Sequence, residues 1–109
     1  MKYKVKLTDY AIEQMQKIME YISKVLKEPE IAEKWSLKVQ NAVTSLSEMP
    51  LRFPLVDKEP WHSENIRKMI VDNFIVYYWT DEEHFTVWVT AIIYGRRDQL
   101  YALKNMPKT

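Results

Sequence analysis

The chain has 109 residues, of which 47% are hydrophobic and 13% aromatic, so we predict one folded domain over residues 1–109 and exclude a disordered chain. The net charge of +1 is far below that of proteins that coat nucleic acid by bulk charge. The absence of cysteine excludes disulfides and thiolate chemistry. With only two histidines no metal-ligand spacing exists, and we expect neither a metal nor a small-molecule cofactor.

The chain begins with alternating lysines and apolar residues over positions 1–7, where a signal peptide would have an apolar block. The longest apolar run, residues 85–94, is too short to span a bilayer. We therefore expect a cytoplasmic protein without a membrane partner.

The N-terminal half predicts one strand and two helices. Tyr3, Val5 and Leu7 alternate with lysines, as in a half-buried strand. Thr8 or Asp9 can then cap a helix of about five turns. Its apolar stripe consists of Ile12, Met15, Ile18, Met19, Ile22, Val25 and Leu26.

The second helix is predicted to begin at Pro29, because proline suits a first helical position. Its stripe consists of Ile31, Trp35, Val39, Ala42, Val43 and Leu46. So short a link predicts an antiparallel helical hairpin. Residues 49–63 contain three prolines and read as a loop. In that loop His62 is an acid–base candidate, because its ordinary pKa lies near neutrality; a solvated histidine is the alternative.

Residues 66–71, 74–79 and 85–93 predict an antiparallel meander with two polar turns. Alternation on the last strand predicts one row beneath the helices and an opposite row that is exposed or lines a cleft. The expected core is Ile12, Met15, Met19, Ile22, Trp35, Val39, Leu46, Val87, Val89, Ala91 and Ile93. The opposite row is Thr86, Trp88, Thr90, Ile92 and Tyr94, an aromatic surface for partner contact or base stacking unless the C-terminal segment covers it.

Residues 98–106 predict a short helix capped by Asp98 and docked through Leu100, Leu103 and Tyr101. The expected fold is therefore α+β with two layers, a helical hairpin over a mostly antiparallel sheet. All four arginines follow residue 50, and arginine is the side chain suited to bidentate phosphate or carboxylate contacts. Arg96 and Arg97 follow Gly95, the only glycine, which we expect to free the backbone for a turn.

This element order, with Arg67-Lys68 opening the meander, residues 73–78 inside it and residues 94–98 closing it, resembles the RelE/ParE superfamily of toxins from bacterial type II toxin–antitoxin modules. The resemblance covers nearly the whole chain, and its specificity lies in the order and spacing of short motifs. It implies a cytoplasmic growth inhibitor of the kind found in plasmid stabilisation systems, neutralised by a cognate antitoxin. It also implies that residues 3–7 pair with the last strand. The antitoxin's C-terminal segment is expected on the sheet edge or the aromatic row.

The superfamily that this chain resembles divides into branches with different targets. RelE-like members cut mRNA on the ribosome, whereas ParE-like members poison DNA gyrase and have no known nucleolytic centre. Lys68 and Arg97 fall on basic positions of the RelE-type site. Ile75 occupies the place of its arginine and Leu103 that of its tyrosine, with Tyr101 two residues earlier.

RNA cleavage requires an activated 2′-hydroxyl, a stabilised phosphate and a protonated leaving oxygen. The candidates for binding phosphate are Arg97 first, Lys68 and Arg67 second, and Arg96 third, the alternative for Arg97 being an ion pair with Asp98 or a helix carboxylate. The candidate bases are His62, Tyr94, Tyr101, Asp57, Glu59 and Glu64.

Three functions follow as hypotheses. The first is a ribosome-dependent mRNA endoribonuclease, slightly favoured because basic residues cluster at both ends of the meander. The second is a gyrase inhibitor without catalysis of its own. The third is an inactive module that only binds the antitoxin.

Overall fold

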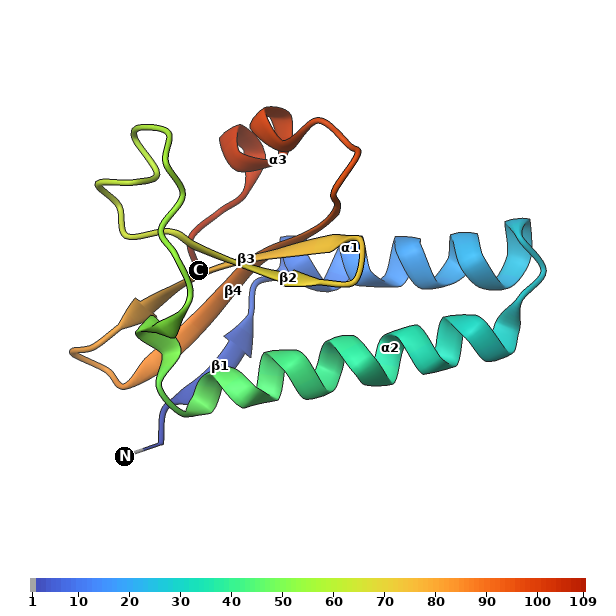
Figure 1. Cartoon of the computed structure of the whole chain (residues 1–109), viewed down its shortest axis with the longest axis horizontal. Helices are drawn as coiled ribbons and strands as arrows, with labels where there is room; N and C mark the ends of the chain where they lie inside the picture. Colours follow the sequence, from blue (N-terminus) through green and yellow to red (C-terminus); the bar gives the residue numbers. More distant parts are fainter. Residues whose placement is uncertain (1) are drawn as a thin grey trace.

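The computed structural model describes residues 2–109 (Figure 1). Its elements are β1 (Lys4–Leu7), α1 (Asp9–Glu20), η1 (Tyr21–Val25), α2 (Pro29–Thr44), η2 (Ser45–Ser47), η3 (Pro50–Arg52), β2 (Arg67–Val71), β3 (Phe74–Asp81), β4 (Thr86–Tyr94) and α3 (Gln99–Asn105). The predicted order of strands and helices is confirmed, with short helical turns added after each long helix and in the proline-rich loop.

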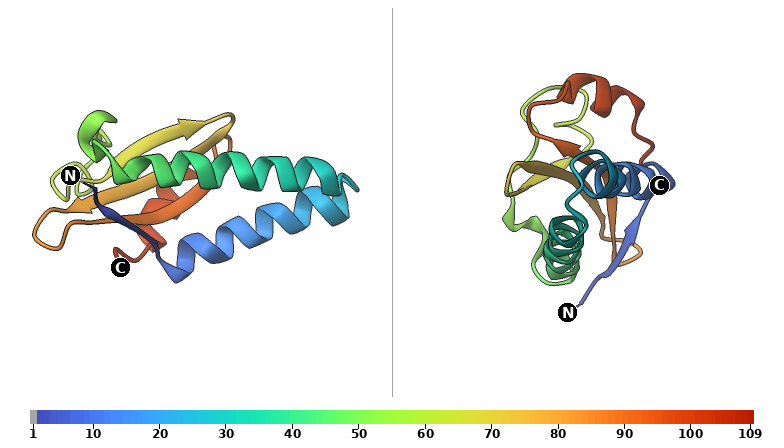
Figure 2. Two further views of the ribbon diagram at one scale, coloured as in Figure 1. Left: turned by 90° about the horizontal axis from the view of Figure 1, so that it is seen from below. Right: turned by 90° about the vertical axis from the view of Figure 1, so that its right-hand side faces the viewer.

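The four strands form one sheet in the order β1-β4-β3-β2. β2, β3 and β4 make the predicted antiparallel meander, and β1 lies parallel to β4, with Lys4 opposite Thr86 and Leu7 opposite Val89. Figure 2 shows the α1–α2 hairpin along one side of the sheet and α3 on the other. The α+β class and the pairing of the first strand with the last are both confirmed.

The helical hairpin begins and turns where the sequence predicts. The Thr8 hydroxyl accepts a hydrogen bond from the Ala11 N–H at 3.1 Å, so Thr8 is the cap of α1. A π-helical turn, η1, extends α1, and Lys27 ends it with a φ of 55°. Pro29 occupies the first turn of α2 as expected.

The predicted helical stripes pack on the core except near the tip of the hairpin and at Ile12. Met15, Ile18, Met19 and Ile22 pack on the core, as do Trp35, Val39 and Val43, and Leu46 is fully buried in η2. The prediction was wrong for exposed residues at the two ends of the stripes, which are Ile12, Val25, Leu26 and Ile31. The hairpin tip extends past the sheet in Figure 1, so no partner layer covers its last turn. At the other end of α1 the buried position is Ala11, with Ile12 on the flank.

A β-bulge divides β4 into two halves. Tyr77 pairs with Ala91 and Tyr78 with Val89, so Thr90 has no residue opposite it. The side-chain alternation therefore reverses at Thr90, because one extra residue moves every later side chain to the other face.

The bulge changes which residues lie beneath the hairpin. Val87, Val89 and Ile92 belong to the core under α1 and α2, whereas Ala91 and Ile93 pack on the α3 side. The prediction that all five residues of one row face the hairpin was therefore wrong for Ala91 and Ile93, and also for Phe85, which is exposed in the turn.

The opposite row does not form one continuous face either, although Ile92 and Tyr94 do line a groove beside α1. Thr86, Thr90 and Ile92 are buried, and Trp88 and Tyr94 lie on opposite faces of the sheet because the bulge separates them. The expectation of one continuous aromatic docking row was therefore wrong.

A second apolar cluster fills the face opposite the hairpin. Its buried members are Val56, Trp61, Ile66, Tyr77, Ala91, Ile93, Ala102, Leu103 and Met106. The Trp61 indole N–H donates to the Leu103 carbonyl at 3.2 Å and joins the loop to α3. Asp98 caps α3 as predicted, accepting from the Tyr101 N–H at 3.0 Å. Leu103 docks, but Leu100 and Tyr101 are exposed, because only one side of so short a helix reaches the sheet.

Replacing Val89 with aspartate is expected to prevent folding. Val89 is completely buried in the main cluster, and burial of such a side chain contributes roughly 1.5–3 kcal/mol. An unpaired carboxylate at that site adds a desolvation cost, and the sum approaches the whole stability of a small domain. Circular dichroism and urea unfolding measure the effect, and Lys24→Asp, at an exposed position, serves as the control. A stably folded Val89→Asp protein would contradict the core assignment.

Tyr78 is expected to make stability fall at high pH. Burial raises the pKa of its phenol to about 12, with Arg67 and Arg52 opposing that rise. An unfolded tyrosine titrates near pH 10, so between about pH 10 and 12 only the unfolded chain loses this proton. The free energy of unfolding is therefore expected to decline over that window and not below it. Urea unfolding across the window should show a shallower decline for Tyr78→Phe; equal slopes would contradict the assignment.

Candidate functional site

A groove of about 1010 Å³ runs between the α1–η1 side of the hairpin and the segment that follows β4. Four tyrosines line it, namely Tyr10, Tyr21, Tyr94 and Tyr101. Its charged residues are Glu13, Lys17, Arg97 and Asp98, and its apolar residues include Ile18, Ile22, Leu26, Phe74 and Ile92. Aromatic side chains with a single arginine over an apolar floor are the composition of protein-docking hot spots.

Gly95 positions the chain that carries Arg97. The Gly95 N–H donates to the Asn73 carbonyl at 2.7 Å, and a Cβ at Gly95 would lie 3.0 Å from that oxygen. A side chain at position 95 would therefore crowd the Asn73 backbone, which explains why glycine is found there. The expectation that glycine supplies unusual backbone freedom was wrong, because Gly95 does not have a positive φ. The Arg97 N–H then donates to the Tyr94 carbonyl at 2.9 Å and closes the turn.

Gln99 holds this turn against the sheet. Its side-chain amide donates to the Tyr94 carbonyl at 2.8 Å and to the Arg97 carbonyl at 2.9 Å. Its side-chain oxygen accepts from the Tyr77 hydroxyl at 2.8 Å. Sequence reasoning missed Gln99 and the α1 wall of the groove, since no motif marks them and only the tertiary packing brings them to Arg97.

Of the seven candidate site residues that are not carboxylates, the structure brings together Tyr94, Arg97 and Tyr101. Lys68 lies on β2 opposite Tyr77, outside the groove. Arg67 lies on the same strand opposite Tyr78 and donates to the Phe53 carbonyl at 2.6 Å. The meander therefore does not gather the basic residues at its two ends.

The other two candidates also lie outside the groove. Arg96 is exposed in the turn, next to Arg97 in sequence but not among the residues that line the groove. The His62 Nδ1 lies 2.9 Å from the Val56 carbonyl oxygen, so the ring is tied to its own loop.

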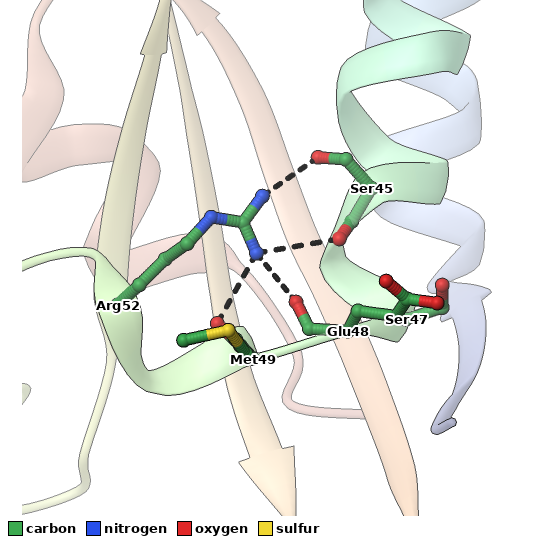
Figure 3. Close-up of a pocket in the computed structure, with 5 residues that line it drawn as sticks. All are labelled: Ser45, Ser47, Glu48, Met49 and Arg52. Carbon is green, nitrogen blue, oxygen red and sulfur yellow. Dashed lines mark hydrogen bonds between the residues drawn. The ribbon is translucent and has the colours of Figure 1, made fainter. Parts of the chain in front are cut away.

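Arg52 has a structural role, which Figure 3 shows. Its guanidinium donates to the carbonyls of Ser45, Glu48 and Met49 and to the Ser45 hydroxyl at 2.9 Å. These carbonyls follow the end of α2, where helical acceptors lack partners within the helix. Arg52 also lines a small pocket of about 300 Å³ beside these carbonyls, where its guanidinium is already engaged by the chain itself.

The positions that would complete a RelE-type site are apolar and packed. Ile75 packs against the second apolar cluster, and Leu103 is one of its buried members. Burial raises the pKa of Tyr77 and, together with the nearby Tyr101, that of Tyr10, so both phenols keep their protons at neutral pH. Glu59 accepts from the Ser63 hydroxyl and N–H, which lower its pKa, and it is thus bound within its loop.

Within residues 2–109 no cluster of three or more metal-ligating side chains occurs. In the same residues no helix is both long and apolar enough to cross a membrane. The arrangement suits the docking of another macromolecule better than acid–base chemistry.

The fold is the one found in toxins of the RelE/ParE superfamily. The sequence model of the family described as ParE toxin of type II toxin–antitoxin system, parDE, matches residues 5–99, and the chain belongs to this family. The superfamily membership expected from the sequence is confirmed. No curated protein is similar enough in sequence to count as a match.

Two solved structures share the fold. The chromosomal ParDE toxin–antitoxin system from P. aeruginosa has a chain that is 18% identical, with a TM-score of 0.69, covering 84% of this chain and 95% of that one. The RelBE2 toxin–antitoxin complex from Mycobacterium tuberculosis has one that is 22% identical, with a TM-score of 0.61, covering 86% and 99%.

The two arginines Arg52 and Arg97 are expected to respond differently to alanine. Arg52→Ala removes four hydrogen bonds at an exposed helix end and should lower the free energy of unfolding by about 1–2 kcal/mol. Arg97→Ala removes an exposed side chain and should change it by less than about 1 kcal/mol. Urea unfolding of both variants measures the difference; a larger loss for Arg97→Ala would assign Arg97 to the scaffold.

Proposed function

We propose that the protein is a cytoplasmic growth inhibitor that binds DNA gyrase without cleaving nucleic acid, and that a cognate antitoxin neutralises it. The observation that best supports this proposal is the packed apolar cluster at Ile75 and Leu103, where the RelE-type site has an arginine and a tyrosine. Lys68 and Arg97 are also apart, since only Arg97 lines the groove. A protein without the constellation for RNA cleavage acts by binding, as the ParE-like members do.

The groove is the proposed target-binding surface, and the antitoxin is proposed to neutralise the toxin by occupying the same groove. An apolar floor with tyrosines on both walls fits the apolar face of an amphipathic helix. Arg97 and Lys17 supply positive charge on either wall for acidic residues of that helix. The two structural neighbours are toxin–antitoxin complexes by name, which agrees with such a partner.

The ribonuclease remains the second candidate because Tyr94, Arg97 and Tyr101 share one groove. A guanidinium can stabilise a phosphate and a phenol can transfer a proton, so this trio retains part of the needed chemistry.

Two assays on the purified toxin separate these targets. Incubation with gyrase and supercoiled plasmid is expected to yield cleaved gyrase–DNA complexes or loss of supercoiling. Ribosomes programmed with mRNA are expected to yield no new cuts by primer extension. Cuts at defined codons with gyrase unaffected would overturn the proposal, and no effect on either target or on growth would identify an inactive antitoxin-binding module.

Arg97→Ala is expected to weaken growth inhibition at least about tenfold in inducer dose, as loss of an interface arginine typically does. The matched control is Arg96→Ala, which removes the same charge one residue away and outside the groove. Equal toxicity of the two variants would show that Arg97 does not belong to the surface that binds the target.

A further inference from the structure

Two tryptophans and two lysines form a continuous row on the end of the sheet far from the groove. Trp79 on β3 pairs directly with Trp88 on β4, and Trp88 pairs with Lys6 on β1. The Lys6 ammonium lies 5.6 Å from the centre of the Trp88 ring, and the Lys108 ammonium lies 5.2 Å from that of Trp79. The order across the sheet is therefore Lys108, Trp79, Trp88, Lys6, which we call the Lys–Trp row.

The C-terminal segment is fixed so that Lys108 completes this row. The Trp79 indole N–H donates to the Lys108 carbonyl at 2.7 Å. Both indoles are only partly exposed, and both lysines are exposed. The aromatic surface is thus only partly covered by the chain itself, and each indole has a cation at its side.

Lysines outnumber carboxylates along the row itself. Lys4 lies two residues from Lys6 on β1, so its side chain points to the same face. Asp81, which pairs with Thr86 beside Lys4, lies on that face too, and the turn after it carries the exposed Glu82 and Glu83. Asp81 accepts from the His84 ring at 2.8 Å and from the His84 N–H at 3.2 Å, so it is occupied within its turn.

We propose that the Lys–Trp row binds a short single-stranded segment of nucleic acid. Neighbouring strands lie about 4.8 Å apart, so the backbones of Lys6 and Trp79 are separated by about 10 Å, which spans roughly two nucleotides. Bases stack on indole faces without regard to sequence, while lysines at both ends neutralise the flanking phosphates. On binding, the ammonium groups move from the rings to the phosphates and expose the stacking surface.

A peptide fits this row less well. An acidic peptide would satisfy the lysines but would leave two adjacent planar indoles without planar partners. The row lies at Trp88, whereas the groove is lined by β4 residues from Ile92 onward, beyond the bulge, and shares no residue with the row, so the two surfaces can be occupied together. The inference does not depend on whether gyrase or the ribosome is the target.

Fluorescence anisotropy with labelled oligothymidylate and oligouridylate, together with the protein's own tryptophan emission, tests the proposal. Trp35 and Trp61 are buried, so quenching on titration reports on Trp79 and Trp88. Both oligonucleotides are expected to bind and to quench; a preference for one identifies DNA or RNA as the natural ligand. Lys6→Glu/Lys108→Glu is expected to weaken binding by about tenfold or more and to flatten its salt dependence.

The matched control is Lys34→Glu/Lys104→Glu, which makes the same charge change at two exposed lysines outside the row. Trp88→Leu is expected to weaken binding about tenfold with the fold intact by circular dichroism. Equal weakening by the row and control variants, binding without quenching, or binding of a poly-glutamate peptide in place of both oligonucleotides would overturn the proposal.

Discussion

The bulge at Thr90 is the constraint on which the rest of the structure depends. Thr90 is completely buried, and its hydroxyl lies 3.2 Å from both the Tyr77 carbonyl oxygen and the Met106 sulfur. Its carbonyl accepts from the Thr8 hydroxyl at 3.3 Å, while the Val89 carbonyl accepts from the Thr8 N–H. Thr90 is thus hydrogen-bonded to β3, to the segment after α3 and to the cap of α1. The positions of the sheet, of α1 and of α3 relative to one another therefore depend on it.

The proposed function rests on what the bulge does to the two faces. It directs Ala91 and Ile93 into the cluster that also contains Leu103, so the α3 face becomes an apolar core. It directs Ile92 and Tyr94 to the hairpin side, where they line the groove with Arg97. A sheet whose far face is filled in this way has little room for a nucleolytic centre there, but it presents a rigid groove to a partner.

The sequence predicts features that depend on neighbouring residues and misses features that depend on tertiary packing. Thr8 and Asp98 are recognisable caps and Pro29 is a recognisable helix start, because each acts within a few residues. The bulge has no such signal. Residues 89–93 are all apolar or threonine, so a two-residue alternation of buried and exposed side chains fits the strand with or without the bulge. The groove was unpredictable for the same kind of reason, since the α1 wall meets Arg97 only through packing.

Contacts on either side of the bulge test this account most directly. In nuclear Overhauser spectra of the methyl-labelled toxin, Ile92 is expected to contact α1, where its N–H donates to the Gln14 side chain at 2.9 Å. Ala91 is expected to contact Ala102 and Leu103 of α3, on the opposite face. Methyl contacts of Ala91 with Met15 or Ile18 of α1, and of Ile92 with Leu103 of α3, would contradict the account, because they would mean an unbroken strand with an open α3 face.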